Sequence, residues 1–491
     1  MASIRTTRSL RILMAASEVA PFAKTGGLGD VLGALPAALQ ALGASVHVVL
    51  PAYRTIDWAA AGAESDGVLQ VWTGGTRRET PLRSARNADV PVSFVVADEF
   101  FDRDHLYGGP TGDYPDNAER FAFFARAIVA LAAHLEPPPD VIHCHDWQTA
   151  LVPVFASAGG PLPGTPRTVL TVHNLGYQGL FPAGVWPLLG LDWSYFTPRN
   201  LEFYGLVNFL KGGLVHADAL TTVSRRYAEE ILEPEQGHGL EGVLRERSDV
   251  LAGILNGVDY VEWNPALDQR LVATYSASDL TGKARCKTAL QEEFGLRIAA
   301  HTPLLGMVSR LADQKGFDIL MAALPELLRL DLQLVILGSG DARYESALAA
   351  EGRRAPDRLA VRIAFDEGAA HRIEAGADAF LMPSRYEPCG LNQMYSLRYG
   401  TVPIVRATGG LDDTISEFDP ITGRGNGFKF GPYAPDALLG GVRRMLDVYH
   451  RPAAWRRVVG NGMTCDFSWR GPAARYLELY RRLVRPSEVS A

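Results

Sequence analysis

Short apolar runs alternate with helix-length segments along almost the whole chain, and this alternation limits what the chain can fold into. Residues 10–17 and 45–50 are apolar runs of strand length, and a helical pattern over about 31–42 separates them. Strands separated by helices predict parallel βαβ units. Because the runs are continuously apolar, we expect strands that are buried on both faces. The sequence therefore predicts an α/β protein with doubly wound sheets.

The alternation runs through the chain twice, which predicts two Rossmann-like domains. A first series of apolar runs ends at 251–254, and a second series begins at 303–309. Turn signals at Asn256-Gly257 and Asn264-Pro265 mark a connector between them. We expect domains over 1–256 and 257–462, followed by a C-terminal segment, 463–491. That segment predicts a helix with one apolar stripe, formed by Tyr476, Leu479, Tyr480 and Leu483. The remaining predicted strands are 94–97, 141–143, 168–172, 219–223, 334–337, 361–364, 379–382 and 402–405.

Charge and cysteine content exclude several classes of protein. A net charge of −7 over 491 residues argues against a general nucleic-acid or anionic-membrane binder. Four widely separated cysteines argue against a disulfide framework or a zinc site and favour a reducing compartment. The basic and apolar start is interrupted by Glu18, and no run approaches the roughly 20 apolar residues of a membrane span. We therefore expect a soluble, cytoplasmic protein.

Open α/β sheets bind ligands beyond the carboxyl ends of their strands. With two such domains, a cleft between them is the expected active site. Between the first strand and the first helix lies KTGGLGD, at residues 24–30. Its glycines permit close approach of a ligand, the helix start favours an anion, and Lys24 adds a positive charge. A turn that only packs the helix against the strand is the alternative.

Two further motifs follow strands of the first half. In HCHDW, at 143–147, alternation along a strand puts His143 and His145 on one face. With one acid nearby, Asp146, this favours a polar wall of a sugar pocket over a metal site, with Trp147 as a packing or stacking residue. A strand end that is merely hydrogen-bonded is the alternative. His173 and Asn174 leave the next strand and can hydrogen-bond sugar hydroxyls.

The second half repeats this arrangement with charged residues. Arg310 and Lys315 lie five residues apart in SRLADQKG, directly after a strand, and can converge on a diphosphate. Together they would neutralise a leaving group without Mg²⁺. A solvated basic loop is the alternative.

A second loop of that half, PSRYEPCGLN, begins at residue 383 and holds Glu387 between Tyr386 and Pro388. This carboxylate can bind sugar hydroxyls or stabilise positive charge at an anomeric carbon, and a surface glutamate in a turn is the alternative. A nucleophilic Cys389 is disfavoured because no histidine partner is evident. The backbone amides of Gly390 and Leu391, and those of the turn at 408–410, add further donors.

Taken together, these motifs resemble the family of bacterial glycogen synthases and plant starch synthases. The resemblance covers nearly the whole chain and is carried by KTGGLGDV, HCHDWQT, LTVHNLGYQG, FLKGGLVHADALTTVS, LNGVDYVEWNP, SRLADQKG, PSRYEPCGLNQ, TGGLDDT and the closing DFSW. It implies the GT-B fold, with two Rossmann-like doubly wound domains that face across a deep interdomain cleft. It also implies a last helix that crosses back to the N-terminal domain.

The resemblance further implies the reaction and its residues. Glucose would pass from ADP-glucose to the non-reducing end of glycogen or another α-1,4-glucan, with retention of configuration, release of ADP, and neither metal nor cofactor. The catalytic residues would be Glu387, Arg310, Lys315 and His173. The substrate-binding residues would be Lys24 and Gly27 at the donor phosphates, Asp146 and Asn174 at the sugar, Tyr114 near the acceptor, Phe365 over adenine, and Gly390, Leu391, Asn392, Thr408 and Gly409. Asn392 stands where threonine is frequent, and its amide can still donate to phosphate.

Two rival readings stay open on the sequence. One is another GT-B enzyme, such as a pyridoxal-phosphate phosphorylase or a UDP-sugar transferase. The other is a non-catalytic glucan-binding protein, which the intact set of charged residues disfavours. Retention itself permits a covalent intermediate on Glu387 or attack on the face that the leaving group departs from. The resemblance to retaining transferases of this fold favours the latter. The oligomeric state is left open.

Overall fold

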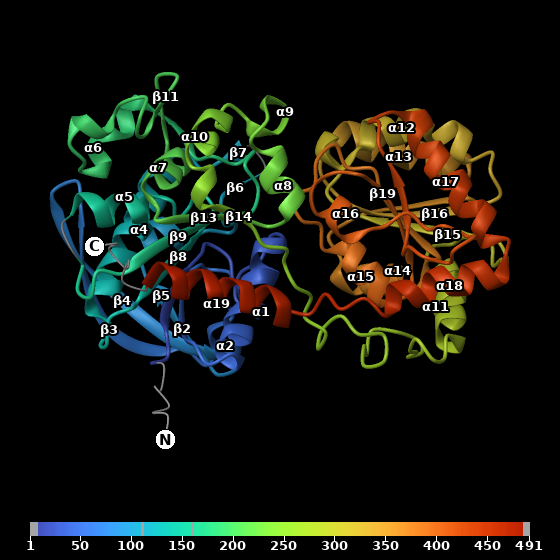
Figure 1. Cartoon of the computed structure of the whole chain (residues 1–491), viewed down its shortest axis with the longest axis horizontal. Coiled ribbons are helices and arrows are strands. Elements are labelled where there is room, and N and C mark those ends of the chain that lie inside the picture. The colour runs from blue at the N-terminus through green and yellow to red at the C-terminus, as the bar shows by residue number, and fades with distance from the viewer. Residues whose placement is uncertain (1–7, 110–111, 160–161, 485–491) are drawn as a thin grey trace, which may run out of the picture. The chain divides into compact units, whose positions relative to one another are not determined.

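The chain folds as two units, each built on its own sheet (Figure 1). The computed structural model describes residues 8–109, 112–159 and 162–484. The first unit comprises the chain up to Val223, Ala228–Gly257 and the chain from Trp469 onward. The second unit comprises Ser224–Tyr227 and Val258–Ser468.

The first unit is built on a nine-stranded sheet in the order β14-β13-β9-β8-β1-β2-β5-β4-β3. The strands that the apolar runs predict are all present, and each pairs in parallel with its neighbour among them. They are β1 (Arg11–Ala15), β2 (Ser45–Pro51), β5 (Val90–Val95), β8 (Val141–His145), β9 (Arg167–Val172), β13 (Ala219–Thr222) and β14 (Leu251–Gly253).

The edge of this sheet is an antiparallel hairpin that the apolar runs do not predict. It consists of β3 (Glu64–Thr73) and β4 (Thr76–Asn87), and β4 pairs with β5. Most of the β3 residues are exposed, Val68 and Trp72 among them. An antiparallel edge can leave one face in water, so these strands carry no continuous apolar run to find.

Five longer helices belong to the first unit: α1 (Gly27–Ala41), α4 (Asn117–His134), α5 (Leu151–Ala158), α7 (Phe209–His216) and α19 (Arg470–Val484). The prediction that the first helix starts near residue 31 was wrong, because Gly27 and Gly29 already lie in its first turn. The predicted stripe of the last helix is largely buried, with Leu483 only partly so, and α19 contacts α1, as Figure 1 shows.

Short elements complete the first unit. They are α2 (Trp58–Ala61), α3 (Asp98–Phe101), β6 (Gly108–Gly109), β7 (Gly112–Asp113), β10 (Leu180–Pro182), α6 (Trp186–Leu189), β11 (Glu202–Phe203), β12 (Leu206–Asn208), α9 (Pro234–Gly237) and α10 (Glu241–Glu246). The short helix α8 (Arg225–Glu230) spans the boundary between the two units.

The second unit is built on six parallel strands in the order β17-β16-β15-β18-β19-β20. They are β15 (Leu304–Val308), β16 (Gln333–Gly338), β17 (Leu359–Ile363), β18 (Ala379–Met382), β19 (Val402–Arg406) and β20 (Phe428–Phe430). Five of them are predicted by apolar runs, whereas the three-residue β20 is too short to stand out. The core packs Leu304, Val335, Phe380 and Val405 of the strands against Ile373 of a helix.

The helices of the second unit are α11 (Thr281–Glu293), α12 (Phe317–Leu327), α13 (Ala342–Arg354), α14 (Glu367–Gly376), α15 (Asn392–Arg398), α16 (Gly409–Thr414), α17 (Pro435–Tyr449) and α18 (Pro452–Met463). The stretch between the two series of apolar runs, interpreted above as a connector, includes a helix of 13 residues, α11. It was missed because its polar face is large and only a few of its residues, among them Cys286 and Leu290, are buried.

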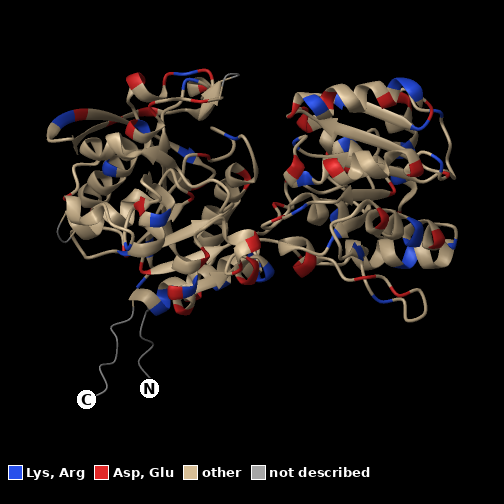
Figure 2. Cartoon of the chain, turned by 90° about the horizontal axis from the view of Figure 1, so that it is seen from above, with Lys and Arg blue, Asp and Glu red and all other residues tan. Residues whose placement is uncertain are grey.

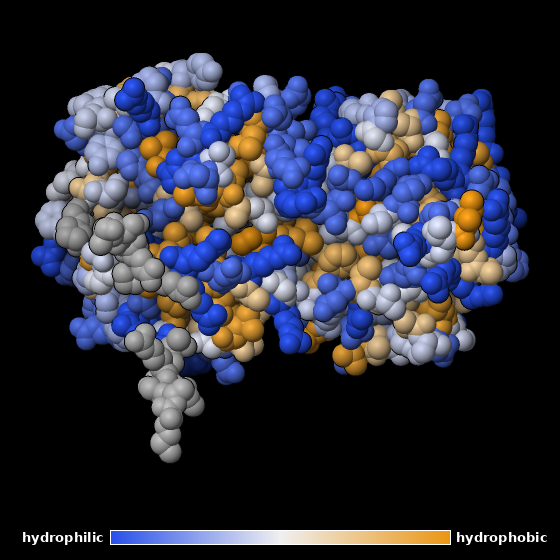
Figure 3. All heavy atoms as spheres, in the orientation of Figure 1, coloured by the Kyte–Doolittle hydropathy of each residue, from blue (hydrophilic) through white to orange (hydrophobic). Residues whose placement is uncertain are grey.

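The surfaces agree with the mixed charge of the chain. Figure 2 shows basic and acidic residues interspersed in both units. On the face drawn in Figure 3, hydrophilic residues predominate and apolar residues form small separated areas. Across the three described ranges, no helix has both the length and the apolar character that a membrane span requires.

Strand order reverses once in each sheet, and these reversals locate the ligand sites. In the first unit the chain runs outward from β1 through β2, then returns to start again at β8 beside β1. In the second unit the same reversal falls between β15 and β18. In open α/β sheets such a switch point leaves a crevice at the carboxyl ends of the strands, where ligands bind.

Candidate active site

Lys315 and Glu387 form an ion pair at the switch point of the second unit. Lys315 lies in a single 3-10 turn after β15, and Glu387 lies in the loop after β18. The ammonium nitrogen of Lys315 is 2.7 Å from Oε2 and 2.9 Å from Oε1 of Glu387. Ser384 donates a further hydrogen bond of 2.9 Å to Oε2. A buried carboxylate is costly unless it is paired, and these donors account for the burial of Glu387.

Two glycines hold the loops of this ion pair together. Gly316 has a φ of +80°, and a Cβ built there would lie 2.0 Å from the carbonyl oxygen of Pro383. Gly409 has a φ of +46°, and its Cβ would lie 1.9 Å from the carbonyl oxygen of Glu387. Gly410 donates its backbone N–H to that same carbonyl at 3.1 Å. The three motifs that follow β15, β18 and β19 therefore pack backbone against backbone, which only glycine permits.

A pocket of about 140 Å³ opens beside the ion pair. It brings together several predicted substrate-binding residues and is lined by Met307, Val308, Ser309, Lys315, Leu381, Met382, Ser384, Glu387, Gly390, Leu391 and Asn392. The side-chain amide of Asn392 donates a 2.9 Å hydrogen bond to the carbonyl of Val308. This residue thus ties the start of α15 to the end of β15, a role that the sequence did not indicate.

Among the described residues, four that the sequence predicts for this site follow strands of the second unit but do not line the pocket: Arg310, Phe365, Thr408 and Gly409. Arg310 is exposed, and its guanidinium lies 3.2 Å from Oε1 of Gln314. Phe365 is 77% exposed in the loop between β17 and α14, which leaves its ring face accessible to a planar ligand. Thr408 is buried at the N-cap of α16.

In the first unit, three histidines gather at the ends of β8 and β9. The rings of His143 and His145 lie on one face of the sheet with their centroids 4.1 Å apart, as the alternation predicts. Nδ1 of His145 is 2.9 Å from Nε2 of His173. Burial lowers the pKa values of His143 and His173 to about 3 and that of His145 well below its usual value. The cluster is therefore uncharged at neutral pH.

Asp146 positions the turn that carries His173 and Asn174. Its φ of +58° is rare outside glycine, and its Oδ1 accepts the backbone N–H of His173 at 2.7 Å. Burial raises the pKa of Asp146 to about 7, while hydrogen bonds from the amides of His173 and Asn174 oppose that shift. Trp147 is a packing residue: a Cβ on Gly179 would lie 2.5 Å from its ring.

The glycine loop after β1 is organised by Glu18, a residue that the sequence analysis used only as a break in an apolar run. Its buried carboxylate accepts hydrogen bonds from the backbone N–H of Thr25 (2.6 Å) and of Gly26 (3.2 Å) and from the Thr25 hydroxyl (2.7 Å). The hydroxyl of Tyr107 donates to it at 2.7 Å. An acid between a strand end and a glycine loop is the signal that could have identified it.

Lys24 and Gly27 stand at the start of α1, where amides at a helix N-terminus favour an anion. The ammonium of Lys24 is 2.7 Å from Oδ1 of Asp30. Tyr114 lies elsewhere in the first unit. Its ring contacts the guanidinium groups of Arg103 and Arg120, 4.7 and 5.1 Å from the ring centroid, and no contact with the histidine cluster is recorded among the described residues.

The matching family descriptions divide the chain in the same way as its sheets. "Starch synthase catalytic domain" matches residues 11–246, and "Glycosyl transferases group 1" matches residues 290–457.

Curated relatives match over almost the full length. A glycogen synthase of Anaeromyxobacter dehalogenans (strain 2CP-1 / ATCC BAA-258) is 53% identical over 97% of this chain and 99% of its own. A glycogen synthase of Koribacter versatilis (strain Ellin345) is 50% identical over 96% of this chain and 98% of its own.

Two solved structures share the fold of this chain over nearly its full length. The catalytic domain of starch synthase IV from Arabidopsis thaliana, bound to ADP and acarbose, superposes with a TM-score of 0.90 at 35% identity. That comparison covers 97% of this chain and all of the other. A sucrose-phosphate synthase from Thermosynechococcus elongatus shares the fold, with a TM-score of 0.61 at 19% identity over 96% of this chain and 99% of its own.

Proposed function

Since this chain belongs to the glycogen and starch synthase family of retaining hexosyltransferases, with the GT-B fold, we propose that its donor is ADP-glucose and its acceptor the non-reducing end of an α-1,4-glucan. The observation that carries the proposal is the Lys315–Glu387 pair beside a pocket at a switch point. ADP bound to the plant starch synthase supports an ADP-sugar as the donor.

In this proposal, the ammonium group of Lys315 lies between Glu387, which faces the sugar, and the diphosphate leaving group. An ammonium has three N–H donors, and the carboxylate of Glu387 engages one or two of them at 2.7 and 2.9 Å. A remaining donor can reach a phosphate oxygen, and the exposed Arg310 supplies a planar second cation. As the bond to the diphosphate breaks, both cations stabilise the charge that develops on it.

Glu387 supports the sugar electrostatically and does not attack it. Both of its oxygens accept a hydrogen bond from Lys315, and Oε2 accepts another from Ser384. These bonds lower the nucleophilicity of the carboxylate, which disfavours a covalent glucosyl intermediate. The glucan 4-hydroxyl then attacks the anomeric carbon on the face that the diphosphate leaves. The new C–O bond forms as the C–O bond to the phosphate breaks, and the hydroxyl proton passes to a phosphate oxygen.

The first unit contributes neutral polar groups and a cation. We assign the glucose hydroxyls to His173 and Asn174, with Asp146 as the positioning residue for both. His173 is uncharged at neutral pH because of its burial, so it acts as a hydrogen-bonding group rather than as an acid. Lys24 and Gly27 are assigned to the donor phosphates. A cytoplasmic location also belongs to this proposal.

The deciding experiment measures ADP release from ADP-glucose with and without glycogen, alongside UDP release from UDP-glucose. We expect glycogen-dependent release of ADP and at least tenfold lower turnover of UDP-glucose. Equal rates with both donors would contradict the ADP-sugar assignment. Binding of maltooligosaccharide without release of nucleotide would favour a non-catalytic glucan-binding protein.

The second experiment addresses the mechanism. We expect mass spectrometry of a slowed variant, His173→Ala, to show only unmodified protein after incubation with ADP-glucose. A glucosyl adduct on a peptide that contains Glu387 would overturn attack on the departing face and establish two successive inversions.

A further inference from the structure

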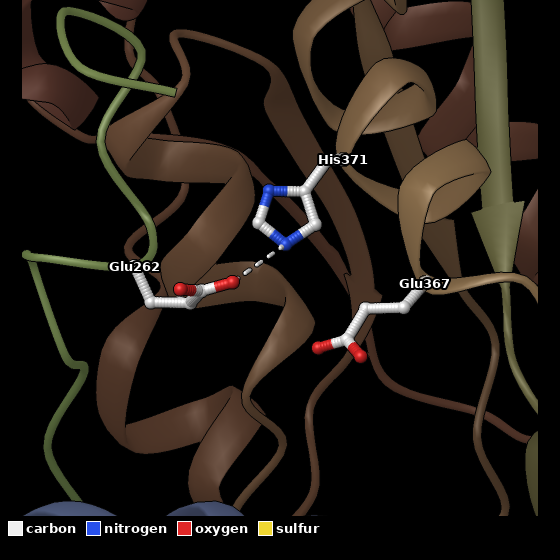
Figure 4. A group of neighbouring side chains, drawn as sticks. All are labelled: Glu262, Glu367 and His371. Atoms are coloured by element: carbon white, nitrogen blue, oxygen red, sulfur yellow. Dashed lines mark ion pairs between the residues drawn. The ribbon is translucent and has the colours of Figure 1, made fainter. Parts of the chain in front are cut away.

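Glu262, Glu367 and His371 surround one small space in the second unit, apart from the ion pair described above (Figure 4). Glu367 and His371 lie four residues apart on α14, and Glu262 lies in a turn shortly after Val258. One ligand atom of each residue lies within 4.8 Å of the others. Nε2 of His371 and Oε1 of Glu262 are 3.8 Å apart.

His371 points a buried nitrogen into this space. The side chain is fully buried, and its Nε2 has no hydrogen-bond partner among the residues that the structure describes. Its other nitrogen, Nδ1, lies 2.8 Å from Oδ2 of Asp268, and this oxygen also accepts the hydroxyl of Tyr399 at 2.7 Å. When Nδ1 carries the proton and donates to Asp268, Nε2 presents its lone pair towards the two glutamates. Metal-binding histidines are oriented by such a carboxylate on the other nitrogen.

Aromatic stacking fixes the orientation of the imidazole. The ring of Trp263 stacks on His371 with centroids 3.7 Å apart and an interplanar angle of 13°. Tyr395 stacks on Trp263 in turn, at 3.8 Å and 4°. Because Trp263 directly follows Glu262, this stack also holds the turn of Glu262 against α14. The histidine is therefore preorganised, whereas both glutamates are exposed and can adjust.

The charges around this space favour a divalent cation. Two carboxylates, those of Glu262 and Glu367, face it from two segments, and a third, that of Asp268, lies against Nδ1 of the same imidazole. Arg270 opposes them, with Nη2 2.7 Å from Oε1 of Glu262 and Nη1 3.8 Å from Oδ1 of Asp268. The side chain of Arg270 is 40% exposed, so it can yield its contact with Glu262 to an incoming ion.

We propose that Nε2 of His371 and the carboxylates of Glu262 and Glu367 bind a first-row divalent transition-metal ion, Zn²⁺ foremost. Imidazole with carboxylates suits such ions, whereas Mg²⁺ and Ca²⁺ prefer oxygen ligands alone. With bonds of about 2.0–2.2 Å, two tetrahedral ligands lie roughly 3.4 Å apart, so small movements of the glutamates close the site. The ion would clamp the segment of Glu262 to the first turn of α14, which directly follows Phe365 and Asp366. The ion is assigned no part in the glucosyl transfer, for which the family resemblance implies no metal.

Metal binding is tested on the full chain after treatment with EDTA. We expect isothermal titration with Zn²⁺ to show one site per chain, and Co²⁺ to give visible absorption bands of a histidine-containing site. Glu262→Gln, Glu367→Gln and His371→Gln should each weaken Zn²⁺ binding at least tenfold. His301→Gln, which removes an exposed histidine of the same unit, is the matched control and should leave the affinity unchanged.

His371→Gln alters a buried stack and can fail to fold, so the two glutamate variants decide the outcome. Absence of Zn²⁺ uptake by the parent chain would overturn the proposal. So would unchanged Zn²⁺ affinity in both glutamate variants, which would place the ion elsewhere on the surface. Binding of Mg²⁺ as tight as that of Zn²⁺ would overturn the assigned class of metal.

Discussion

The ammonium nitrogen of Lys315 lies 2.7 Å from Oε2 of Glu387, across 72 residues of sequence. The cation assigned to the leaving group and the carboxylate assigned to the sugar are thus one hydrogen-bonded unit. Removal of either partner leaves the other without its counter-charge in a largely buried setting. Their contributions to catalysis are therefore expected to depend on each other.

We predict non-additive losses from substitutions at this pair. Lys315→Ala should lower kcat about 10²–10³-fold, the range seen when a transition-state hydrogen-bond donor is lost. Glu387→Ala should reduce it at least as strongly. The double variant should lose far less than the product of the two, because each single change already disables the unit. Steady-state ADP release measures all three, and Arg329→Ala, at an exposed arginine just after the end of α12, is the control. Fully multiplicative losses would contradict the coupling.

Gly409→Ala should reduce activity by displacing Glu387. A methyl group at this position would overlap the carbonyl oxygen of Glu387, and the φ of +46° disfavours residues other than glycine. We expect at least a tenfold loss of kcat while the nucleotide still binds, because the carboxylate moves and the chain remains folded. Gly460→Ala is the matched control, since its Cβ would meet nothing within 4 Å. Equal activity of both variants would show that the loop of Glu387 tolerates the shift.

Stability should fall as the pH drops below about 6.5, owing to histidines buried in the neutral state. Burial lowers the pKa of His47 to about 4 and those of His143 and His173 to about 3. Between these values and 6.5 the unfolded chain binds more protons than the folded one, so protonation favours unfolding. At pH 5 each histidine should cost on the order of 2 kcal/mol relative to pH 7. Denaturant unfolding at several pH values measures the slope.

The control for the acid effect is His105→Gln, which removes an exposed histidine from the same unit. We expect this variant to retain the full pH dependence of the parent chain. A free energy of unfolding that stays constant from pH 7 to pH 5 would show that these histidines titrate normally in the folded state.

Tyr480→Phe should destabilise the first unit without changing turnover. The hydroxyl of Tyr480 lies 2.7 Å from Nδ1 of His143, and both groups are buried. Loss of one partner of a buried hydrogen bond costs about 1–3 kcal/mol. Thermal unfolding should shift to lower temperature, with kcat at 25 °C unchanged. Tyr204→Phe, at a residue that is 86% exposed, should leave both quantities unaltered. A stable Tyr480→Phe chain would mean that water replaces the lost hydroxyl.

The buried strands and the positions of the site motifs could be predicted from the sequence, because they depend on the order of apolar and polar residues within short segments. The continuously apolar runs at β1, β15 and β18 identify strands that are buried on both faces. A polar motif that directly follows such a strand lies at the carboxyl edge of the sheet, where ligands bind. The candidate site residues could therefore be identified from the sequence. The alternation of His143 and His145 likewise predicts their shared face, since the strand period is two.

The tertiary structure decided which of these motifs meet. The reversal of strand order puts β15 beside β18, and only then do Lys315 and Glu387 pair. The same holds for Glu18 in the glycine loop and for Trp263 stacked on His371. Local sequence sets the period and burial of each element, because these depend on neighbours along the chain. Contacts between loops depend on how crossovers order the strands, which is a property of the whole sheet and has no signature in any one segment.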